Sequence, residues 1–161
     1  MKAFDQLYQK HYPTVFRVAV KMLGDSDEAA DVVQEVFLTL FQTMEKGMVV
    51  EYPLSWLYRT TLNKCIDKQK YNGRFQKLET APEGQVEFQS IEKQETRIRV
   101  QRALGKLKPV ERALAVMYSE SLSYKEMAEA TGIRFSSVGK TLSRTLKKLE
   151  AELKNKKYEL Y

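Results

Sequence analysis

The sequence is poor in the residues that build metal sites and active sites. Cys65 is the only cysteine and His11 the only histidine among 161 residues. A single thiol excludes an internal disulfide and any zinc site made of several cysteines. The sequence offers no glycine-rich phosphate loop and no catalytic partner for Cys65 or His11. We therefore expect no metal, no cofactor and no enzymatic activity.

Long apolar runs are missing as well. The first ten residues, MKAFDQLYQK, lack the apolar core of a signal peptide, and no stretch approaches the ~18 apolar residues of a membrane span. Hydrophobic residues make up 43% of the chain and charged residues 30%, which is ordinary for a protein that folds in water. We expect a cytoplasmic protein.

Proline and glycine are scarce, with four and seven residues, and apolar residues recur at intervals of three and four. These features predict an all-α protein, with helices over about residues 3–23 and 54–70 among others. Two glycines, a proline and scattered polar residues interrupt the pattern over 72–90, as in a linker. The sequence predicts two small helical domains, 1–71 and 91–161, joined by a flexible linker over 72–90.

Charge is distributed unevenly along the chain. The net charge is +6 and the isoelectric point is near 9.3, which favours an anionic partner such as nucleic acid. Residues 51–78 and 99–161 are basic, whereas residues 1–50 and 79–98 carry an excess of acids. Two basic blocks therefore alternate with two acidic ones, and the acidic blocks are expected to have a different task.

Residues 25–44, DSDEAADVVQEVFLTLFQTM, hold five acids and no base. Asp25 is placed to cap a helix, whose buried stripe comprises Ala29, Val33, Val36, Phe37, Leu40 and Met44. The opposite side gathers Asp31, Gln34, Glu35 and Leu38. Exposure to solvent would explain Asp31, Gln34 and Glu35. Leu38 among them indicates a surface on which another molecule docks.

Residues 122–150 predict a helix-turn-helix motif. Ser123 and Glu126 form a capping box, Gly132 turns the chain and Ile133 plugs the turn before a longer helix. The second helix of such a motif enters the major groove of DNA. Its outward positions carry groups that suit phosphates and base edges: Arg134, Ser136, Ser137, Lys140, Thr141, Arg144 and Lys148. The interior Gly139 costs ~1 kcal/mol relative to alanine and either permits close approach to DNA or weakens the helix.

Residues 53–70 combine aromatic and basic side chains, as unpaired nucleic acid requires for base stacking and charge neutralisation. The candidate residues are Trp56, Tyr58, Arg59, Asn63, Lys64 and Lys68. The alternative interpretation is that Trp56 belongs to the core and the lysines are solvent charges. Cys65 fits a small buried apolar residue, and His11 fits a surface or hydrogen-bonded one.

Taken in order, three segments resemble the extracytoplasmic-function sigma factors of bacterial RNA polymerase. They are LYQKHYPTVFRVAVKMLGDSDEAADVVQEVFLTLF, PLSWLYRTTLNKCID, and LGKLKPVERALAVMYSESLSYKEMAEATG with SSVGKTLSRTLKKL. The resemblance implies a factor of the sigma-70 family that binds core polymerase and directs it to promoters. Region 2 would be residues 1–71 and region 4 residues 91–161. Thr60 and Thr61 depart from the family, which more often has an apolar pair there.

The resemblance also assigns tasks to the candidate residues. The face with Asp31, Gln34, Glu35 and Leu38 would bind the clamp helices of the largest polymerase subunit. The helix over residues 56–67 would melt and read the minus-ten element, and the helix around 136–148 would read the minus-thirty-five element as duplex. A separate anti-sigma protein, associated with the inner membrane, is implied as the regulator that holds the chain there.

Two other functions stay open at this stage. A sigma-like decoy would occupy an anti-sigma factor without starting transcription, although it would need no surface for melted DNA. A helix-turn-helix regulator with an N-terminal sensor domain would leave the acidic face unexplained. Core-polymerase binding followed by promoter-dependent transcription separates both from a sigma factor.

Overall fold

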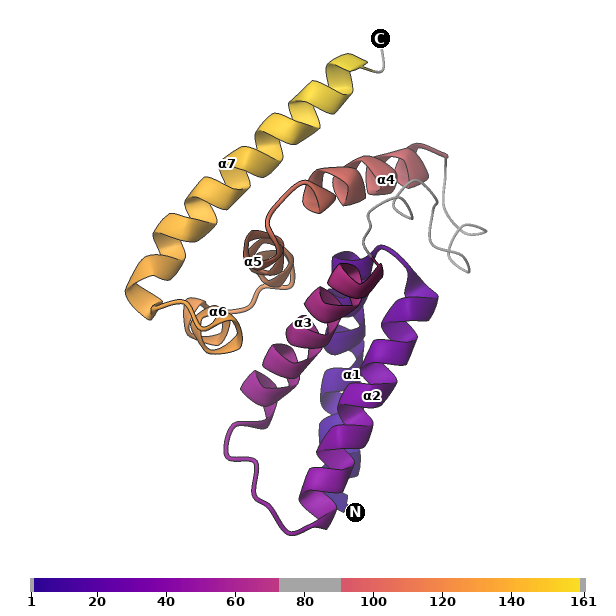
Figure 1. The fold of residues 1–161 in the computed structure, drawn as a ribbon, viewed down its shortest axis with the longest axis vertical. Coiled ribbons are helices and arrows are strands. Elements are labelled where there is room, and N and C mark those ends of the chain that lie inside the picture. Colours follow the sequence, from indigo (N-terminus) through magenta and orange to yellow (C-terminus); the bar gives the residue numbers. More distant parts are fainter. Residues whose placement is uncertain (1, 73–90, 160–161) are drawn as a thin grey trace.

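The computed structural model describes residues 2–72 and 91–159, and every regular element in these ranges is an α-helix (Figure 1). The N-terminal group comprises α1 (Lys2–Leu23), α2 (Ser26–Glu45) and α3 (Pro53–Asn72). The C-terminal group comprises α4 (Ile91–Gly105), α5 (Pro109–Ser119), α6 (Tyr124–Thr131) and α7 (Phe135–Glu159). The all-α fold class is confirmed.

Two of the sequence-based expectations lie partly or wholly outside this part of the chain. Nearly all of the predicted linker falls on residues 73–90, which are not among the described residues. The linker and the division into domains therefore stay predictions. Within residues 2–72 and 91–159, no helix combines the length and the apolar composition needed to cross a bilayer.

Local signals fix the junction between α1 and α2. Gly24 has a φ of 74°, a left-handed conformation that ends α1 at low steric cost. The carboxylate of Asp25 then accepts hydrogen bonds from the backbone amides of Asp27, at 2.8 Å, and Glu28, at 3.1 Å. These amides have no partner inside the helix, so Asp25 stabilises the start of α2 by ~1 kcal/mol.

The helices α1, α2 and α3 pack around a shared core. The buried side of α2 consists of Ala29, Val32, Val33, Val36, Phe37 and Leu40, which is the predicted stripe with Val32 added and Met44 only half-buried. Each such large apolar side chain contributes about 1.5–3 kcal/mol by leaving water. The ring of Phe37 meets Tyr8 of α1 edge-on, with the ring centres 4.9 Å apart. This packing fixes which side of α2 faces solvent.

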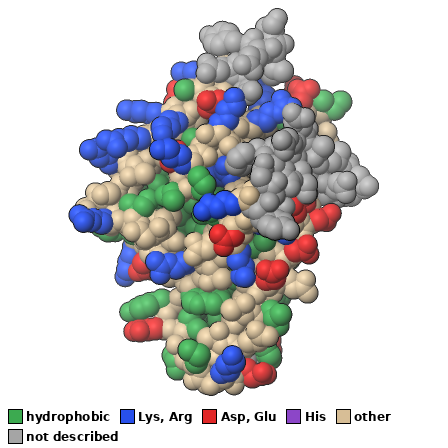
Figure 2. Space-filling model, viewed as in Figure 1, with side chains coloured by type: hydrophobic (Ala, Val, Ile, Leu, Met, Phe, Trp, Pro, Cys, Tyr) green, Lys and Arg blue, Asp and Glu red, His purple; other side chains and the backbone are tan. Residues whose placement is uncertain are grey.

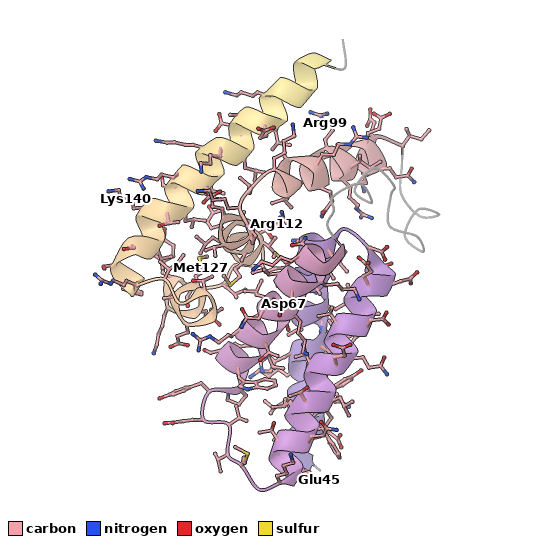
Figure 3. The ribbon with its side chains drawn as sticks, viewed as in Figure 1. Glu45, Asp67, Arg99, Arg112, Met127 and Lys140 are labelled. Carbon is pink, nitrogen blue, oxygen red and sulfur yellow. The ribbon has the colours of Figure 1, made fainter. Side chains whose placement is uncertain are left out.

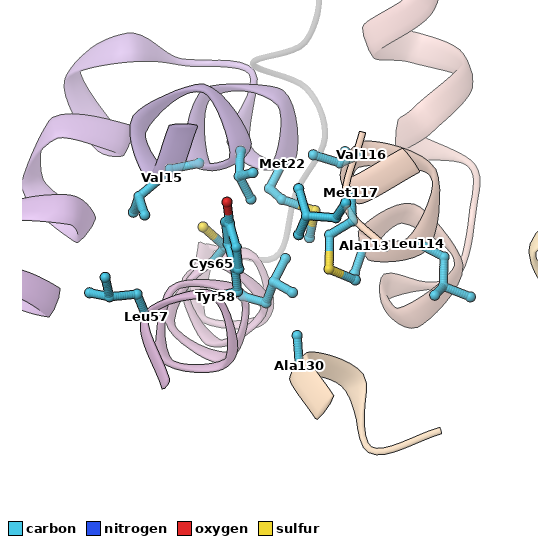
Figure 4. Close-up of a cluster of buried hydrophobic side chains, with 14 of the residues drawn as sticks. Val15, Met22, Leu57, Tyr58, Cys65, Ala113, Leu114, Val116, Met117 and Ala130 are labelled. Atoms are coloured by element: carbon cyan, nitrogen blue, oxygen red, sulfur yellow. The ribbon is translucent and has the colours of Figure 1, made fainter. Parts of the chain in front are cut away.

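The two helical groups share one continuous core. Helix α6 packs against α3, and α5 packs against α1. Figure 4 shows Met22 of α1 beside Met117 of α5, and Cys65 of α3 belongs to the same cluster; all three side chains are fully or almost fully buried. The structure therefore shows the two groups in contact, a feature that the sequence did not predict.

Polar contacts also join the groups. The carboxylate of Glu120, with a side chain only 7% exposed, accepts a hydrogen bond from Arg17 Nε at 2.9 Å and from Lys21 Nζ at 2.6 Å. On another side, the hydroxyl of Ser55 donates to the carboxylate of Glu129. Two cations on one shielded carboxylate make Glu120 the strongest polar link between α1 and the C-terminal group.

The unusual threonine at position 61 leads to a stability prediction. Thr61 is fully buried, and its hydroxyl has no hydrogen-bond partner among the described residues. We expect Thr61→Val to raise the free energy of unfolding by about 1 kcal/mol, because valine removes a buried polar group that costs free energy. Urea unfolding followed by circular dichroism measures the change.

Thr145 provides the matched control for this prediction. It is also fully buried, but its hydroxyl donates to the carbonyl of Thr141 at 2.8 Å. Thr145→Val should therefore lower the free energy of unfolding by about 1 kcal/mol. Equal destabilisation by both substitutions would contradict the assignment of Thr61 as unpaired.

Candidate functional site

The acidic face of α2, which we define as Asp31, Gln34, Glu35 and Leu38, is exposed throughout. Leu38 keeps 54% of its surface in solvent although it is a large apolar residue. The stripe on the other side of α2 is already buried against α1 and α3, so Leu38 contributes nothing to the core. An apolar residue surrounded by polar ones has the composition of the centre of a protein interface. The binding role itself stays a prediction.

Helix α3 brings together three of the candidate residues for the minus-ten element. Trp56, Arg59 and Asn63 follow one another at intervals of three and four, which places them on one face of the helix. Arg59 and Asn63 are exposed, and Trp56 is half-buried against the core. The face thus offers an indole, a guanidinium and a carboxamide on the same side.

The structure places Tyr58 on the opposite face of α3 and buries it, contrary to the exposure that a contact with DNA requires. Tyr58 is only 3% exposed, and its side chain is hydrogen-bonded to Thr14 of α1. Burial raises the pKa of the Tyr58 hydroxyl to about 12, with Glu126 and Glu120 adding to the shift. We assign Tyr58 to the core, where its ring cannot stack on a base in this arrangement.

The remaining basic candidates on α3 lie nearer α2. Lys64 is half-buried, and its ammonium group is 3.6 Å from the carboxylate of Glu35 on the acidic face. Lys68 follows one turn later and is also half-buried. The acidic face and the basic side of α3 are therefore neighbours, and the Lys64–Glu35 pair, which solvent reaches at both side chains, contributes at most ~1 kcal/mol.

A hollow of about 650 Å³ adjoins Trp56 and Arg59, and part of its lining comes from residues that were not among the candidates predicted from the sequence. The connection between α2 and α3 contributes Met48, Val49 and Tyr52, which are 61%, 91% and 65% exposed. Exposed apolar and aromatic side chains beside a basic residue suit an unpaired base. The signal was present in the sequence as MVVEY, residues 48–52, in which three apolar residues and a tyrosine stand between a glycine and a proline.

The predicted helix-turn-helix is built by α6 and α7. Ser123 caps α6 by accepting from the amide of Glu126 at 3.1 Å, and the Glu126 carboxylate accepts from the amide of Ser123 at 2.8 Å. Gly132 adopts the left-handed conformation, with a φ of 82°, and turns the chain into α7. The capping box and the glycine turn expected from the sequence are confirmed.

Helix α7 turns its candidate DNA-binding residues toward solvent. The buried side carries Val138, Leu142 and Thr145. Figure 2 shows basic side chains along the side of the molecule formed by α7, and Figure 3 shows Lys140 projecting away from the body. The candidates divide by exposure: Arg134, Ser136, Lys140, Arg144 and Lys148 are exposed, whereas Ser137 and Thr141 are half-buried.

Lys148 has a partner within the protein. Its ammonium group lies 2.6 Å from the carboxylate of Glu111, which also accepts from the amide of Lys108 at the start of α5. The hydrogen bond from Lys148 holds the pKa of Glu111 below its usual value, against a smaller opposing effect of burial. Lys148 therefore ties α7 to α5 in this structure, and a contact with DNA would have to compete with Glu111.

Gly139 is explained by packing within the motif. A Cβ built on Gly139 would lie 3.3 Å from the ring of Tyr124, the first residue of α6. Few real contacts of this kind are so short, so the absence of a side chain lets the tyrosine ring lie against α7. The glycine serves the contact between α6 and α7, an alternative that the sequence analysis did not consider.

The lone cysteine is buried, and the lone histidine is half-buried. Burial raises the pKa of the Cys65 thiol to about 12, so the thiol is protonated and unreactive at neutral pH. Partial burial and the nearby Lys10 lower the pKa of His11. Among the residues that the structure describes, no three potential ligands from His, Cys, Asp and Glu gather as a metal site would require.

Comparison with known proteins links both halves of the chain to one family. The family model for sigma-70 region 2 matches residues 7–75, and the model for sigma-70 region 4 matches residues 97–149. The extracytoplasmic-function sigma factor SigE of Mycolicibacterium smegmatis is 28% identical over 153 residues, which cover 89% of this chain and 59% of SigE. SigM of Mycobacterium tuberculosis is 32% identical over 124 residues, which cover 76% of this chain and 61% of SigM.

A solved structure shares the fold. The sigma factor RpoE of Bartonella quintana, in complex with the anti-sigma factor NepR, superposes with a TM-score of 0.72. The match covers 96% of this chain and 98% of that one at 20% identity. The chain spans about three fifths of the length of the curated relatives. With regions 2 and 4 matched in order along one polypeptide, this chain belongs to the extracytoplasmic-function sigma factors of the sigma-70 family.

Proposed function

We propose that the chain is a transcription initiation factor that binds core RNA polymerase and directs it to specific promoters. The observation that carries the proposal is the presence of three differently composed exposed surfaces on one chain of this family. They are the acidic face of α2, the aromatic and basic face of α3, and the basic side of α7. One protein interface and two DNA interfaces are what an initiation factor requires.

The acidic face is the proposed contact with polymerase. Its acids suit a basic partner surface, and Leu38 supplies apolar area at the centre. By the family resemblance, that partner is the pair of clamp helices in the largest subunit.

The two DNA surfaces have different proposed substrates. Trp56, Arg59, Asn63, Lys64 and Lys68 would bind the minus-ten element as a melted strand, since stacking on a ring requires an unpaired base. Flipping a base out of the duplex costs a few kcal/mol, which stacking on Trp56 and contacts with Arg59 would offset. The exposed side of α7 would read the minus-thirty-five element as duplex DNA.

Reconstitution tests the proposal. The purified chain is mixed with core polymerase, and the complex is used for run-off transcription on fragments of the source genome. We expect a stable complex and transcripts that start at defined sites and require the chain. Binding without transcripts would instead indicate a decoy, and binding to neither polymerase nor promoters would reject the proposal. We assign no catalytic step to the chain itself.

We also infer an anti-sigma factor as the regulatory partner. The fold resembles that of a sigma factor solved with such a partner, and the family resemblance suggests that the partner is membrane-associated. The test deletes each neighbouring gene in turn and measures transcription that depends on the chain. If no deletion changes this transcription, the result argues against such a partner.

The contact between the two helical groups bears on promoter binding. Helix α6 lies against α3, and Ala128, Glu129 and Gly132 of α6 and its cap form one side of the hollow beside Trp56 and Arg59. A promoter strand would need this space. We infer that the groups separate before the minus-ten face can be used.

Glu120→Lys tests this inference. The substitution places a third cation beside Arg17 and Lys21, so repulsion replaces two ion pairs of 2.9 and 2.6 Å. We expect an increase in the radius of gyration, measured by small-angle X-ray scattering, and about tenfold tighter binding of a single-stranded minus-ten oligonucleotide. Unchanged dimensions with unchanged binding would contradict the inference. Glu150→Lys, which replaces an exposed acid of α7 that pairs with Lys154 of the same helix, controls for charge.

The same contact should depend on pH. Burial opposes ionisation of Glu120, but hydrogen bonds from Lys21 and Arg17 outweigh it and lower the pKa below the usual 4.5. A depressed carboxyl pKa means that the stabilisation is present above pH 4.5 and is lost as the pH falls through the lowered value. In the wild-type chain the ion pairs of Glu120 should therefore hold the two helical groups together at neutral pH.

A further inference from the structure

An aromatic flank borders the exposed polar side of α7. We define it as Phe135, the first residue of α7, together with Tyr124, whose ring lies against Gly139 one turn further along. Phe135 is 62% exposed and Tyr124 is 45% exposed. The ring of Tyr124 thus lies where a side chain at position 139 would otherwise extend from α7.

Folding does not account for the exposure of Phe135. The ring belongs neither to the buried core nor to the half-buried side chains packed against it. A phenyl group in water forgoes the stabilisation that burial would provide, so Phe135 has apolar area free for a contact with another molecule. Its neighbours in the chain, Arg134 and Ser136, are exposed and polar.

The position of Phe135 indicates what that partner is. The N-terminal residues of a recognition helix are those that reach base edges in the major groove. Side chains in a helix lean toward its N-terminus, so the ring at the first position extends beyond the end of α7. Lys140 and Arg144, exposed on the following turns, complement the charge of a DNA backbone.

We propose that Phe135 is a specificity-determining residue that packs against the C5-methyl group of a thymine in the minus-thirty-five element. Thymine alone among the four bases offers an apolar group in the major groove, and phenylalanine is a known partner for it. The inference rests on the proposed function, because it requires α7 to bind duplex promoter DNA. It adds apolar readout at one position to the polar contacts expected from Lys140 and Arg144.

Replacing thymine by uracil tests the contact, because it removes the methyl group and nothing else. The upstream element is first selected from a randomised duplex library with holoenzyme made from the full chain and core polymerase. Each thymine of the selected element is then replaced by uracil in turn, and equilibrium binding of the holoenzyme is measured. We expect one uracil to weaken wild-type binding about fourfold, the effect of one buried methyl group.

Variants distinguish a contact by Phe135 from other causes. Phe135→Ala should weaken binding to the thymine duplex about as much and show no further loss with uracil, whereas Phe135→Leu should keep part of the discrimination. Arg144→Ala should bind more weakly but retain the fourfold ratio. Because Phe135 is largely exposed, these variants are expected to fold, which circular dichroism verifies.

Each remaining outcome has a defined meaning. A selected element in which no uracil affects binding, or an unchanged uracil penalty in Phe135→Ala, overturns the inference while leaving the proposed function intact. If the holoenzyme forms but the selection enriches no sequence, the result counts against the proposed function, and the inference fails with it.

Discussion

The double substitution Asp31→Lys/Glu35→Lys is expected to weaken binding to core RNA polymerase at least a thousandfold. Both carboxylates are exposed on the acidic face, one helical turn apart, beside Leu38. Two lysines would set like charges against the basic partner surface that we propose, which costs several kcal/mol. About 4 kcal/mol corresponds to a thousandfold change in affinity. Titration of the fluorescently labelled chain with core polymerase, without DNA, measures the loss.

The fold should survive this change. The pair at i and i+4 is of like charge before and after substitution, so the helix itself is little affected. The Glu35–Lys64 contact that is lost joins an exposed carboxylate to a half-buried lysine at 3.6 Å and contributes at most ~1 kcal/mol. Circular dichroism should show the same helix content as in the wild-type chain.

A charge-matched control separates the acidic face from net charge. Glu45 and Glu51 are also exposed acids, but they lie at and beyond the C-terminal end of α2. Glu45→Lys/Glu51→Lys makes the same change in net charge, and lysine at a helix C-terminus is compatible with the helix dipole. If both double variants bind core polymerase equally, our assignment of the polymerase surface is wrong.

Local chemistry made much of the fold predictable. Gly24 with Asp25, and Ser123 with Glu126 and Gly132, act over a few residues, so their sequence order alone indicates where helices end and begin. The period of the apolar residues likewise indicated the buried side of α2. The exposure of Leu38 followed from the same period, because a helix that buries one side against the core exposes the opposite side to solvent.

Features that depend on long-range packing could not be read from the sequence. Tyr58 and Trp56 are two residues apart and equally aromatic, yet they face opposite sides of α3, and only the packing of α1 against α3 decides which is buried. The links from Glu120 to Arg17 and Lys21 span about a hundred residues. Spacing along the chain carries no signal for contacts of that kind.

Arg112→Ala is expected to lower the free energy of unfolding by about 3 kcal/mol. Arg112 is a residue of α5 that is only 1% exposed, and Figure 3 labels it on that helix. Its Nε donates to the carbonyl of Leu104 at 2.9 Å, and its Nη2 lies 3.3 Å from the carbonyls of Gly105 and Leu107. Alanine would remove a charged donor from the end of α4 and leave a cavity, and the two losses add. Urea unfolding followed by circular dichroism measures the change.

Two further variants separate the causes. Burial lowers the pKa of Arg112 to about 10, so the guanidinium is still charged at neutral pH and its burial itself costs free energy. Arg112→Met fills the space without charge and should lose only about 1–2 kcal/mol, the cost of the unpaired carbonyls. The exposed Arg102→Ala on α4 should change stability by at most about 0.5 kcal/mol. If alanine at position 112 cost no more than alanine at 102, the three carbonyl contacts would not be what joins α4 to α5.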